Sequence, residues 1–220
     1  MKPIIHFAAL ACALAAALVP ASPALAQDTP PSDSAVAPPN ALRQGTWSLS
    51  FSAPGYSGSG ERVEFGVWEM VGPRTNLGLT LEVNVSGYDR ETEGGGQQAK
   101  QSDAATSFLL GLNARQYVRA GRGIAPFVHG RVFGRGNYSR RESSGYEETT
   151  RGMGVGTEAA VGVEWFPVRS FSVAGHTGAR LQFARSEQTL TDPADEEQSA
   201  DYHYASFQTF TSALSVQIYF

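Results

Sequence analysis

The last seventeen residues, YASFQTFTSALSVQIYF, alternate between apolar and polar side chains as far as the final phenylalanine. One parity carries large apolar residues: Phe210, Leu214, Val216, Ile218 and Phe220. The other parity carries small and polar residues: Thr209, Thr211, Ala213, Ser215 and Gln217. Because successive side chains of a β-strand point to opposite faces, this stretch predicts a strand with one apolar and one polar face.

The other end of the chain has the features of a secretory signal. Lys2 precedes an apolar run over 4–19, and Ala24-Leu25-Ala26 forms a small-x-small cleavage site. We therefore assign residues 1–26 to a signal peptide. Residues 27–44, QDTPPSDSAVAPPNALRQ, are rich in proline and serine without periodicity, which predicts an extended periplasmic leader. Residues 45–220 remain as one β-domain.

Composition limits the chemistry of the mature chain. After the signal, no apolar run approaches the roughly 20 residues that a membrane helix needs, so a membrane span would have to consist of strands. Removal of the signal also removes Lys2 and Cys12, leaving 16 basic and 21 acidic residues and no cysteine. Disulfides and thiol chemistry are thereby excluded. The mild acidity excludes a basic nucleic-acid footprint, so no nucleic-acid partner is expected.

Alternating strand-like runs recur from Thr46 to the end of the chain. The expected strands are 46–53, 62–71, 77–86, 108–114, 126–138, 155–165, 171–183 and 204–220. Long polar connections over 54–61, 87–103, 139–152 and 184–201 alternate with short turns. Short turns at one end and long external loops at the other are typical of membrane barrels, whereas a soluble sandwich has no reason for this asymmetry. We predict an all-β, eight-stranded, antiparallel, transmembrane up-and-down β-barrel.

Aromatic residues gather near the expected strand ends, where the membrane interfaces would lie. The residues assigned to these interfaces are Trp47, Tyr88, Tyr138, Trp165, Phe171 and Tyr204. The alternative is that they are ordinary β-formers packing on neighbouring strands.

Charged residues fall on the polar parity of several strands, which faces the lumen. This set consists of Glu64, Glu82, Glu158, Glu164, Arg115, Arg131, Arg135 and Arg180. The interior of an eight-stranded barrel is just wide enough for side chains to fill, and unpaired buried charges are costly. We therefore expect the charges to pair across the lumen as a structural plug. The alternative is a network that opens a narrow channel by exchanging partners.

Two segments carry a family resemblance. Ala125–Gly134, APFVHGRVFG, and the stretch GVEWFP over 162–167 followed by FSVAGH resemble strands of the small OmpA/OmpX-like outer-membrane β-barrel family. The resemblance implies a barrel in the bacterial cell outer membrane, without a C-terminal peptidoglycan-binding domain. Its expected partners are outer-membrane lipid, lipopolysaccharide and the outer-membrane assembly machinery, and it is expected to be a monomer. The residues expected to serve as the C-terminal assembly signal are Phe210, Val216, Ile218 and Phe220.

Some small outer-membrane barrels modify lipopolysaccharide with a paired Ser and His. Here the His-x-Ser element of that type is missing at His129, His176 and His203, and all three are expected to face inward. A nucleophile and its base must lie within hydrogen-bond reach, and Ser206 is on the opposite face from His203. We therefore expect no enzyme activity and no cofactor.

The expected loops contain two charged groups. The acidic residues Asp192, Asp195, Glu196, Glu197 and Asp201 match no calcium-motif spacing, so we expect solvated charge and no metal site. Arg140, Arg141 and Arg151 suit contact with lipopolysaccharide phosphates. The sequence thus favours a structural or surface-interaction role, adhesion-like, through external loops. A narrow, non-specific pore is the alternative, and a soluble periplasmic β-barrel binding protein is the third reading.

Overall fold

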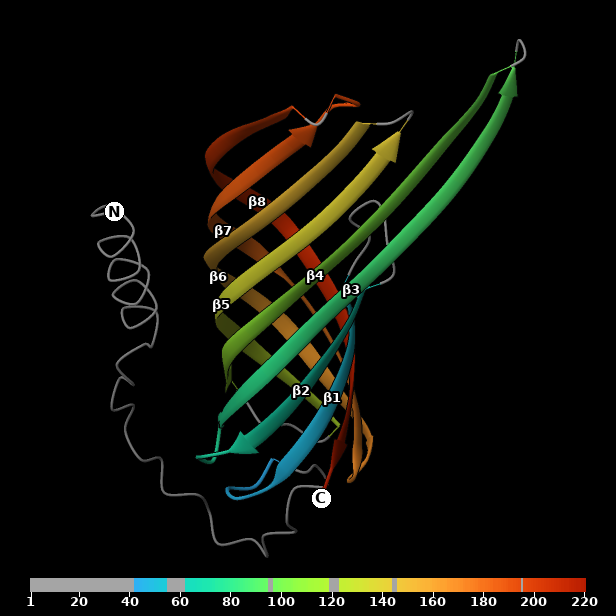
Figure 1. Cartoon of the computed structure of the whole chain (residues 1–220). Coiled ribbons are helices and arrows are strands. Elements are labelled where there is room, and N and C mark those ends of the chain that lie inside the picture. The colour runs from blue at the N-terminus through green and yellow to red at the C-terminus, as the bar shows by residue number, and fades with distance from the viewer. Residues whose placement is uncertain (1–41, 55–61, 95–96, 119–122, 144–145, 195) are drawn as a thin grey trace, which may run out of the picture.

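The chain forms a closed, eight-stranded antiparallel barrel (Figure 1). The computed structural model describes residues 42–54, 62–94, 97–118, 123–143, 146–194 and 196–220. Each strand pairs with the next in the chain, and β1 pairs with β8 to close the ring. The strands are β1 (Trp47–Pro54), β2 (Arg62–Met70), β3 (Thr75–Gly94), β4 (Gln97–Tyr117), β5 (Ile124–Ser143), β6 (Tyr146–Val168), β7 (Phe171–Thr191) and β8 (Glu197–Tyr219). The predicted up-and-down barrel is confirmed.

The two ends of the barrel differ. The turns after β2 and β6, the start of β1 and the C-terminus share one end, which we call the turn end (Figure 1). The opposite end, the hairpin end, is formed by the tips of the β3–β4, β5–β6 and β7–β8 hairpins. The expected signal peptide, the leader up to residue 41 and most of the connection over 54–61 lie outside the described residues.

Three of the predicted long loops are strand extensions. β3 and β4 stay paired as far as Gly94 and Gln97, and β5 and β6 as far as Ser143 and Tyr146. β7 and β8 are paired over most of 184–201 as well. The prediction of loops over 87–103, 139–152 and 184–201 is therefore wrong, since most of these residues belong to paired strands. Beyond the apolar band both faces of a strand meet water, so the alternation that identifies a strand disappears from the sequence.

The outer surface of the barrel is apolar around its circumference. Side chains such as Leu79, Leu110 and Val163 are each about half exposed, although they are large and apolar. The inward positions on the same strands hold buried polar groups, including Thr80, Asn113 and Glu164. This inside-out arrangement suits lipid surroundings, since soluble monomers rarely expose such a large continuous apolar surface. The described residues include no helix with the length and hydropathy to cross a membrane.

A β-bulge in β8 reverses the alternation of its outer half. Gly178 pairs with Thr211, but the next residue, Ala179, pairs with Thr209, so Phe210 has no partner in the register. Phe210 has a φ of 59°, in the left-handed region that non-glycine residues rarely adopt. One extra residue between partners changes which parity faces outward. Thr209 therefore faces outward, as its partner Ala179 does. The sequence analysis had placed Thr209 on the polar parity, which was expected to face the lumen along the whole strand.

Candidate functional site: the barrel interior and the hairpin end

The turn end of the lumen is organised around one buried carboxylate. Glu164 on β6 is fully buried and accepts a hydrogen bond from Arg115 Nη1 at 2.8 Å. The Tyr117 hydroxyl donates to the same oxygen, Oε2, at 2.6 Å. The hydroxyls of Ser172 and Tyr219 donate to the other oxygen. Strands β4, β7 and β8 thus supply donors to Glu164, and we call these five residues the Glu164 cluster.

Arg115 is held on several sides. Its guanidinium carbon lies 4.3 Å from the ring centre of Phe127 and 4.8 Å from that of Trp68. The Gln217 amide satisfies both of its neighbours when its oxygen accepts from Arg115 Nη1 at 2.5 Å and its nitrogen donates to the Tyr219 hydroxyl at 2.9 Å. A buried guanidinium needs a paired charge, which Glu164 provides, while Arg115 Nε is buried without a hydrogen-bond partner among the described residues.

An apolar layer surrounds the Glu164 cluster. It consists of Leu42, Met70, Tyr117, Ala125, Phe127, Phe166, Ala174 and Tyr219, all of which are buried. Leu42 belongs to the segment before β1, where Gly45 N donates to the Met70 carbonyl at 2.7 Å. Leu42, in the segment expected as leader, is therefore buried against the barrel, whereas Arg43 and Gln44 are exposed. All residues of the apolar layer are buried, and Arg115, Met70 and Gln217 are only 0 to 2 % exposed, so side chains fill this section of the lumen.

A second polar layer lies further along the lumen. Arg180 donates twice to one oxygen of Glu158, from Nε at 2.9 Å and from Nη2 at 2.7 Å. His176 Nε2 lies 3.6 Å from the other oxygen of Glu158. The His176 ring also stacks on that of His129, with the centroids 5.1 Å apart. Two charges and two imidazoles are thus packed against one another inside the barrel.

A second ion pair lies across the same section. Arg131 Nη1 is 2.6 Å from Glu64 Oε2, and Arg131 Nη2 donates to Thr80 Oγ1 at 2.8 Å. Asn113 donates to the same hydroxyl oxygen at 3.0 Å. The Nδ1 atoms of both lumen histidines and the Nε of Arg131 are buried without a hydrogen-bond partner in the described part of the chain. The layer is therefore polar, and its arginines are paired with carboxylates, but these three buried nitrogens remain without a hydrogen-bond partner among the described residues.

All eight predicted lumen charges lie on inward positions. The structure joins six of them in pairs: Glu64 with Arg131, Glu158 with Arg180, and Glu164 with Arg115. Glu82 is buried opposite Glu64 in the β2–β3 register. Arg135 is half-buried on the same face, closer to the hairpin end. The set predicted from the sequence contains only charged residues. It therefore omits the uncharged polar residues that contact Glu164 and Arg115 from inward positions: Tyr117, Ser172, Gln217 and Tyr219.

No protein-family model matches the chain, and no curated protein matches it. A crystal structure of a major outer membrane protein from Thermus thermophilus superimposes with a TM-score of 0.55 at 11 % sequence identity, over 81 % of this chain and 100 % of that chain. This chain has the fold of an outer-membrane β-barrel. The barrel domain of Pseudomonas aeruginosa OprF (TM-score 0.41, 11 % identity, 80 % of this chain and 98 % of that one) is also similar. Neisserial surface protein A is similar too, with a TM-score of 0.35 and 9 % identity over 80 % of this chain and 95 % of that one.

With an outer-membrane barrel fold, the predicted interface aromatics divide into two groups. Trp47, Tyr138 and Trp165 are exposed on the outer surface, and Phe171 lies on the same face partly covered. Tyr88 and Tyr204 differ from the expectation, because the register places them on the inner face, opposite Asp103 and Ala184. For Tyr204 the cause is the bulge at Phe210. For Tyr88 the expectation used the position along the strand and ignored its parity.

The histidines divide in the same way. His129 and His176 face the lumen as expected. His203 was expected to face inward as well, but it pairs with Arg185, whose parity is outward. This difference also follows from the bulge. Ser206 remains on the opposite face from His203, so the described residues hold no Ser–His pair at this position.

Several charged residues of the hairpin end are paired with one another. On the outer surface, Arg140 lies 2.7 Å from Glu142 and 2.9 Å from Glu147, and Arg185 lies 2.9 Å from Asp201. Arg151 stacks over the ring of Tyr138 at 5.8 Å. Arg141, by contrast, faces inward and contacts Asp103. The three arginines expected to meet lipid phosphates therefore do not form one patch.

The acidic segment after β7 forms a turn. Asp192 Oδ1 accepts hydrogen bonds from the backbone nitrogens of Ala194 and Glu196, both at 2.9 Å. Asp195 lies outside the described residues. Among the described residues, no three acidic, histidine or cysteine side chains are grouped as a metal site. The Asp192 side chain thus has a structural role in ending the hairpin.

Proposed function

We propose that this protein is an integral outer-membrane barrel with a closed lumen, which serves a structural or surface-interaction role through its extended hairpins. The single observation that carries the proposal is the Glu164 cluster. It fills the turn end of the lumen with buried, mutually bonded side chains, as a structural plug does. The exposed apolar band, facing lipid, and the secretory signal support the location in the outer membrane.

The extended hairpins support the surface role. Short turns lie on the periplasmic side of outer-membrane barrels and long connections lie outside the cell, so the hairpin end would face the exterior. Here the external part is built of paired strands that continue the barrel wall, and binding residues on such a rigid scaffold are held in position. The proposal includes no catalytic residue. It takes outer-membrane lipid, lipopolysaccharide and the assembly machinery as partners, the last through Phe210, Val216, Ile218 and Phe220, and it takes the protein to be a monomer.

The closed lumen is tested by conductance. We would refold the mature chain, residues 27–220, and insert it into planar bilayers. No stepwise current is expected, because the buried side chains of the Glu164 cluster fill this section of the lumen. The variant Arg115→Ser/Glu164→Ser removes the buried ion pair at the centre of the plug and should produce steps. Steady single-channel current from the unmodified protein would replace this proposal with the narrow-pore reading.

The surface role is tested in cells that display the protein. Replacing 88–103 of the β3–β4 hairpin by a short turn should reduce adhesion to immobilised glycoprotein and cell-to-cell aggregation. The matched control keeps the hairpin and carries Gly130→Ala on the lipid face, where nothing lies within 4 Å of the added Cβ. Equal adhesion of the truncated and control strains, at equal surface amounts, would refute the surface role.

A further inference from the structure

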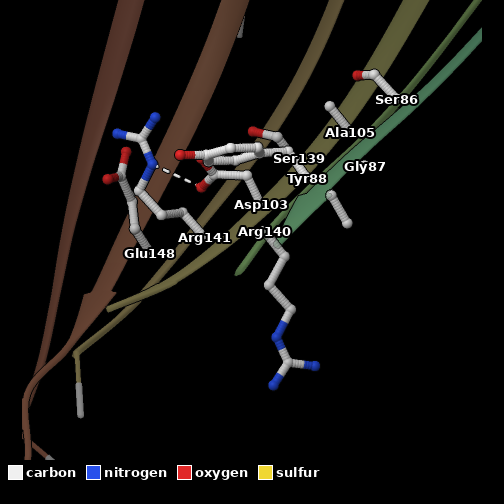
Figure 2. Close-up of a pocket in the computed structure, with 10 residues that line it drawn as sticks. Ser86, Gly87, Tyr88, Asp103, Ala105, Ser139, Arg140, Arg141 and Glu148 are labelled. Atoms are coloured by element: carbon white, nitrogen blue, oxygen red, sulfur yellow. Dashed lines mark hydrogen bonds and ion pairs between the residues drawn. The ribbon is translucent and has the colours of Figure 1, made fainter. Parts of the chain in front are cut away.

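The hairpin end contains a half-open cup of about 440 Å³ on the inner face of β3 to β6. Figure 2 shows the charged and aromatic side chains gathered at one side of it, with the Arg140 guanidinium pointing away. Its lining consists of Ser86, Gly87, Tyr88, Asp103, Ala104, Ala105, Ser139, Arg140, Arg141 and Glu148. None of the roles proposed above uses this cup.

The strand register explains why these side chains meet. Tyr88 pairs with Asp103, Asp103 with Arg141, and Arg141 with Glu148, so four strands contribute to one cross-strand row. The next row towards the membrane is Ser86, Ala105, Ser139 and Thr150. At about 4.8 Å between neighbouring strands, the first row extends over about 14 Å, which is wider than a single sugar ring.

The charged groups of the row are held in place. Arg141 Nε donates to Asp103 Oδ1 at 2.7 Å, and Gln101 donates to the other oxygen of Asp103 at 3.2 Å. Gln188 donates to Glu148 at 2.7 Å. The Arg141 side chain is nevertheless 58 % exposed, so its terminal nitrogens are accessible from the cup. Groups fixed in this way lose little freedom when a ligand binds.

The composition of the cup limits its ligand. Asp103 and Glu148 outnumber Arg141 on the inner face, which disfavours phosphates and carboxylates. Apart from Tyr88 and Arg140, whose guanidinium points away, the remaining lining is glycine, alanine and serine, which disfavours an aliphatic ligand. Adjacent carboxylates and a guanidinium match hydroxyl groups, because each hydroxyl both donates and accepts. The exposed ring of Tyr88 gives the C–H face of a sugar a flat apolar surface.

The same inner face continues around the barrel to β8. Tyr202 and Tyr204 lie on inward parity there, opposite Ser186 and Ala184, and about half of each side chain is exposed. Three exposed tyrosines on the inside of the hairpin end are unnecessary for contact with lipid. They extend the amphipathic surface beyond the cup.

We propose that the cup binds a neutral oligosaccharide, with Tyr88 stacking on one sugar ring and Asp103, Arg141 and Glu148 bonding to its hydroxyls. The inference deepens the proposed surface role and rests on it for the exposure of the cup to the exterior. The sugar belongs to the cell's own surface polysaccharide or to a glycan on another surface. Both sources present the same chemistry.

The experiment uses the mature chain refolded in a detergent without a sugar head group. The probes are arrayed neutral hexose and N-acetylhexosamine oligosaccharides, from bacterial polysaccharide and from animal glycoprotein, followed by calorimetric titration of the best probe. Binding should weaken by at least about tenfold in Tyr88→Ala and in Arg141→Gln. Tyr138→Ala, on the lipid side of the same sheet, should bind as the unmodified protein does. A boiling-dependent gel shift checks that every variant is folded.

The outcomes separate the two proposals. Absence of binding to any neutral probe, preference for sialylated or phosphorylated probes, or unchanged binding in Tyr88→Ala would overturn the sugar assignment. If the β3–β4 truncation abolishes adhesion while no neutral sugar binds, the surface role stands and the sugar site is wrong. If the purified protein binds sugar but the truncation leaves adhesion unchanged, the sugar site stands and the surface role is wrong.

Discussion

Glu164 combines complete burial with bonds to four neighbouring side chains. Replacing Glu164 by alanine would leave the Arg115 charge buried without its counter-charge. Removing one partner of a buried pair typically costs about 3–5 kcal/mol, and we expect that loss in the free energy of unfolding. Urea unfolding of the barrel in lipid vesicles, followed by tryptophan fluorescence, measures it.

The matched control for Glu164→Ala is Glu147→Ala, which breaks the half-exposed pair with Arg140. Exposed pairs contribute less than about 1 kcal/mol, so this variant should unfold almost as the unmodified protein does. Equal unfolding midpoints for the two variants would mean that the Glu164 cluster does not stabilise the barrel. Replacing Arg115 and Glu164 together by leucine and methionine should recover part of the loss, since no charge then remains buried.

Gly78 is a second residue whose identity the interior dictates. The Trp68 ring occupies the space that a Cβ at position 78 would need, and the Trp68 indole nitrogen donates to Ser50 at 2.8 Å. Gly78→Val should therefore displace the indole, break that bond and destabilise the barrel by about 1–3 kcal/mol. Near-ultraviolet circular dichroism reports the displacement. The lipid-facing Gly130→Ala should leave the spectrum unchanged, and an unchanged spectrum for Gly78→Val would contradict the packing.

At the scale of the strand, the sequence was informative wherever one face meets lipid and the other the lumen. The alternation of Leu77, Leu79 and Leu81 identified β3 and its orientation, because the two faces differ in environment. Beyond Val85 both faces of the same strand are polar, so the extension to Gly94 left no periodic signal. The bulge at Phe210 was also invisible, because an apolar residue stands where the regular alternation expects one.

A charged residue on the lipid face of β3 tests that alternation. Leu81→Arg places a charge on an exposed apolar side, where it should cost about 2–4 kcal/mol or prevent folding into vesicles. Thr80 is a poor inward control, because it is 1 % exposed and accepts from Arg131 and Asn113. Asn84→Arg, half-buried on the inward face, is the suitable control and should fold. Equal yields of folded Leu81→Arg and Asn84→Arg would refute the assigned faces.

The bulge makes a prediction of its own in β8. The mature chain has no cysteine, so a single cysteine can be introduced and labelled with a fluorophore. Phe207, which pairs with Leu181, should face lipid, and Gln208, which pairs with Arg180, should face inward. Brominated lipid should therefore quench the label at Phe207→Cys more than at Gln208→Cys. An unbulged strand gives the opposite order, so that result would exclude the bulge.

For the whole molecule, the ring is closed where β1, its shortest strand, pairs with β8. β1 pairs with β8 over Ser48–Pro54, whereas β3 to β8 pair with each other far beyond that level (Figure 1). The Glu164 cluster, drawn from β4, β6, β7 and β8, lies at this closed end, and its apolar layer adds residues of β2, β5 and the segment before β1. The half of the barrel nearer the turn end, which we call the lower barrel, therefore contains the β1–β8 pairing that closes the ring (the seam), the Glu164 cluster and the apolar band. The hairpins extend from it.

This division predicts that the lower barrel folds without the hairpin extensions. A variant with short turns in place of 88–103, 139–150 and 186–201 keeps the seam, the plug and the lipid-facing band. It should still migrate faster on a detergent gel before boiling than after it, since closed barrels resist the detergent until heated. Its unfolding midpoint should stay near that of the full chain, because the lost strand pairs lie in water. Glu164→Ala, with every hairpin intact, should lose its folded band at a lower temperature. A truncated chain without a heat-dependent shift would mean that the external sheet is required to close the barrel, and the hairpins would then be structural parts of the wall.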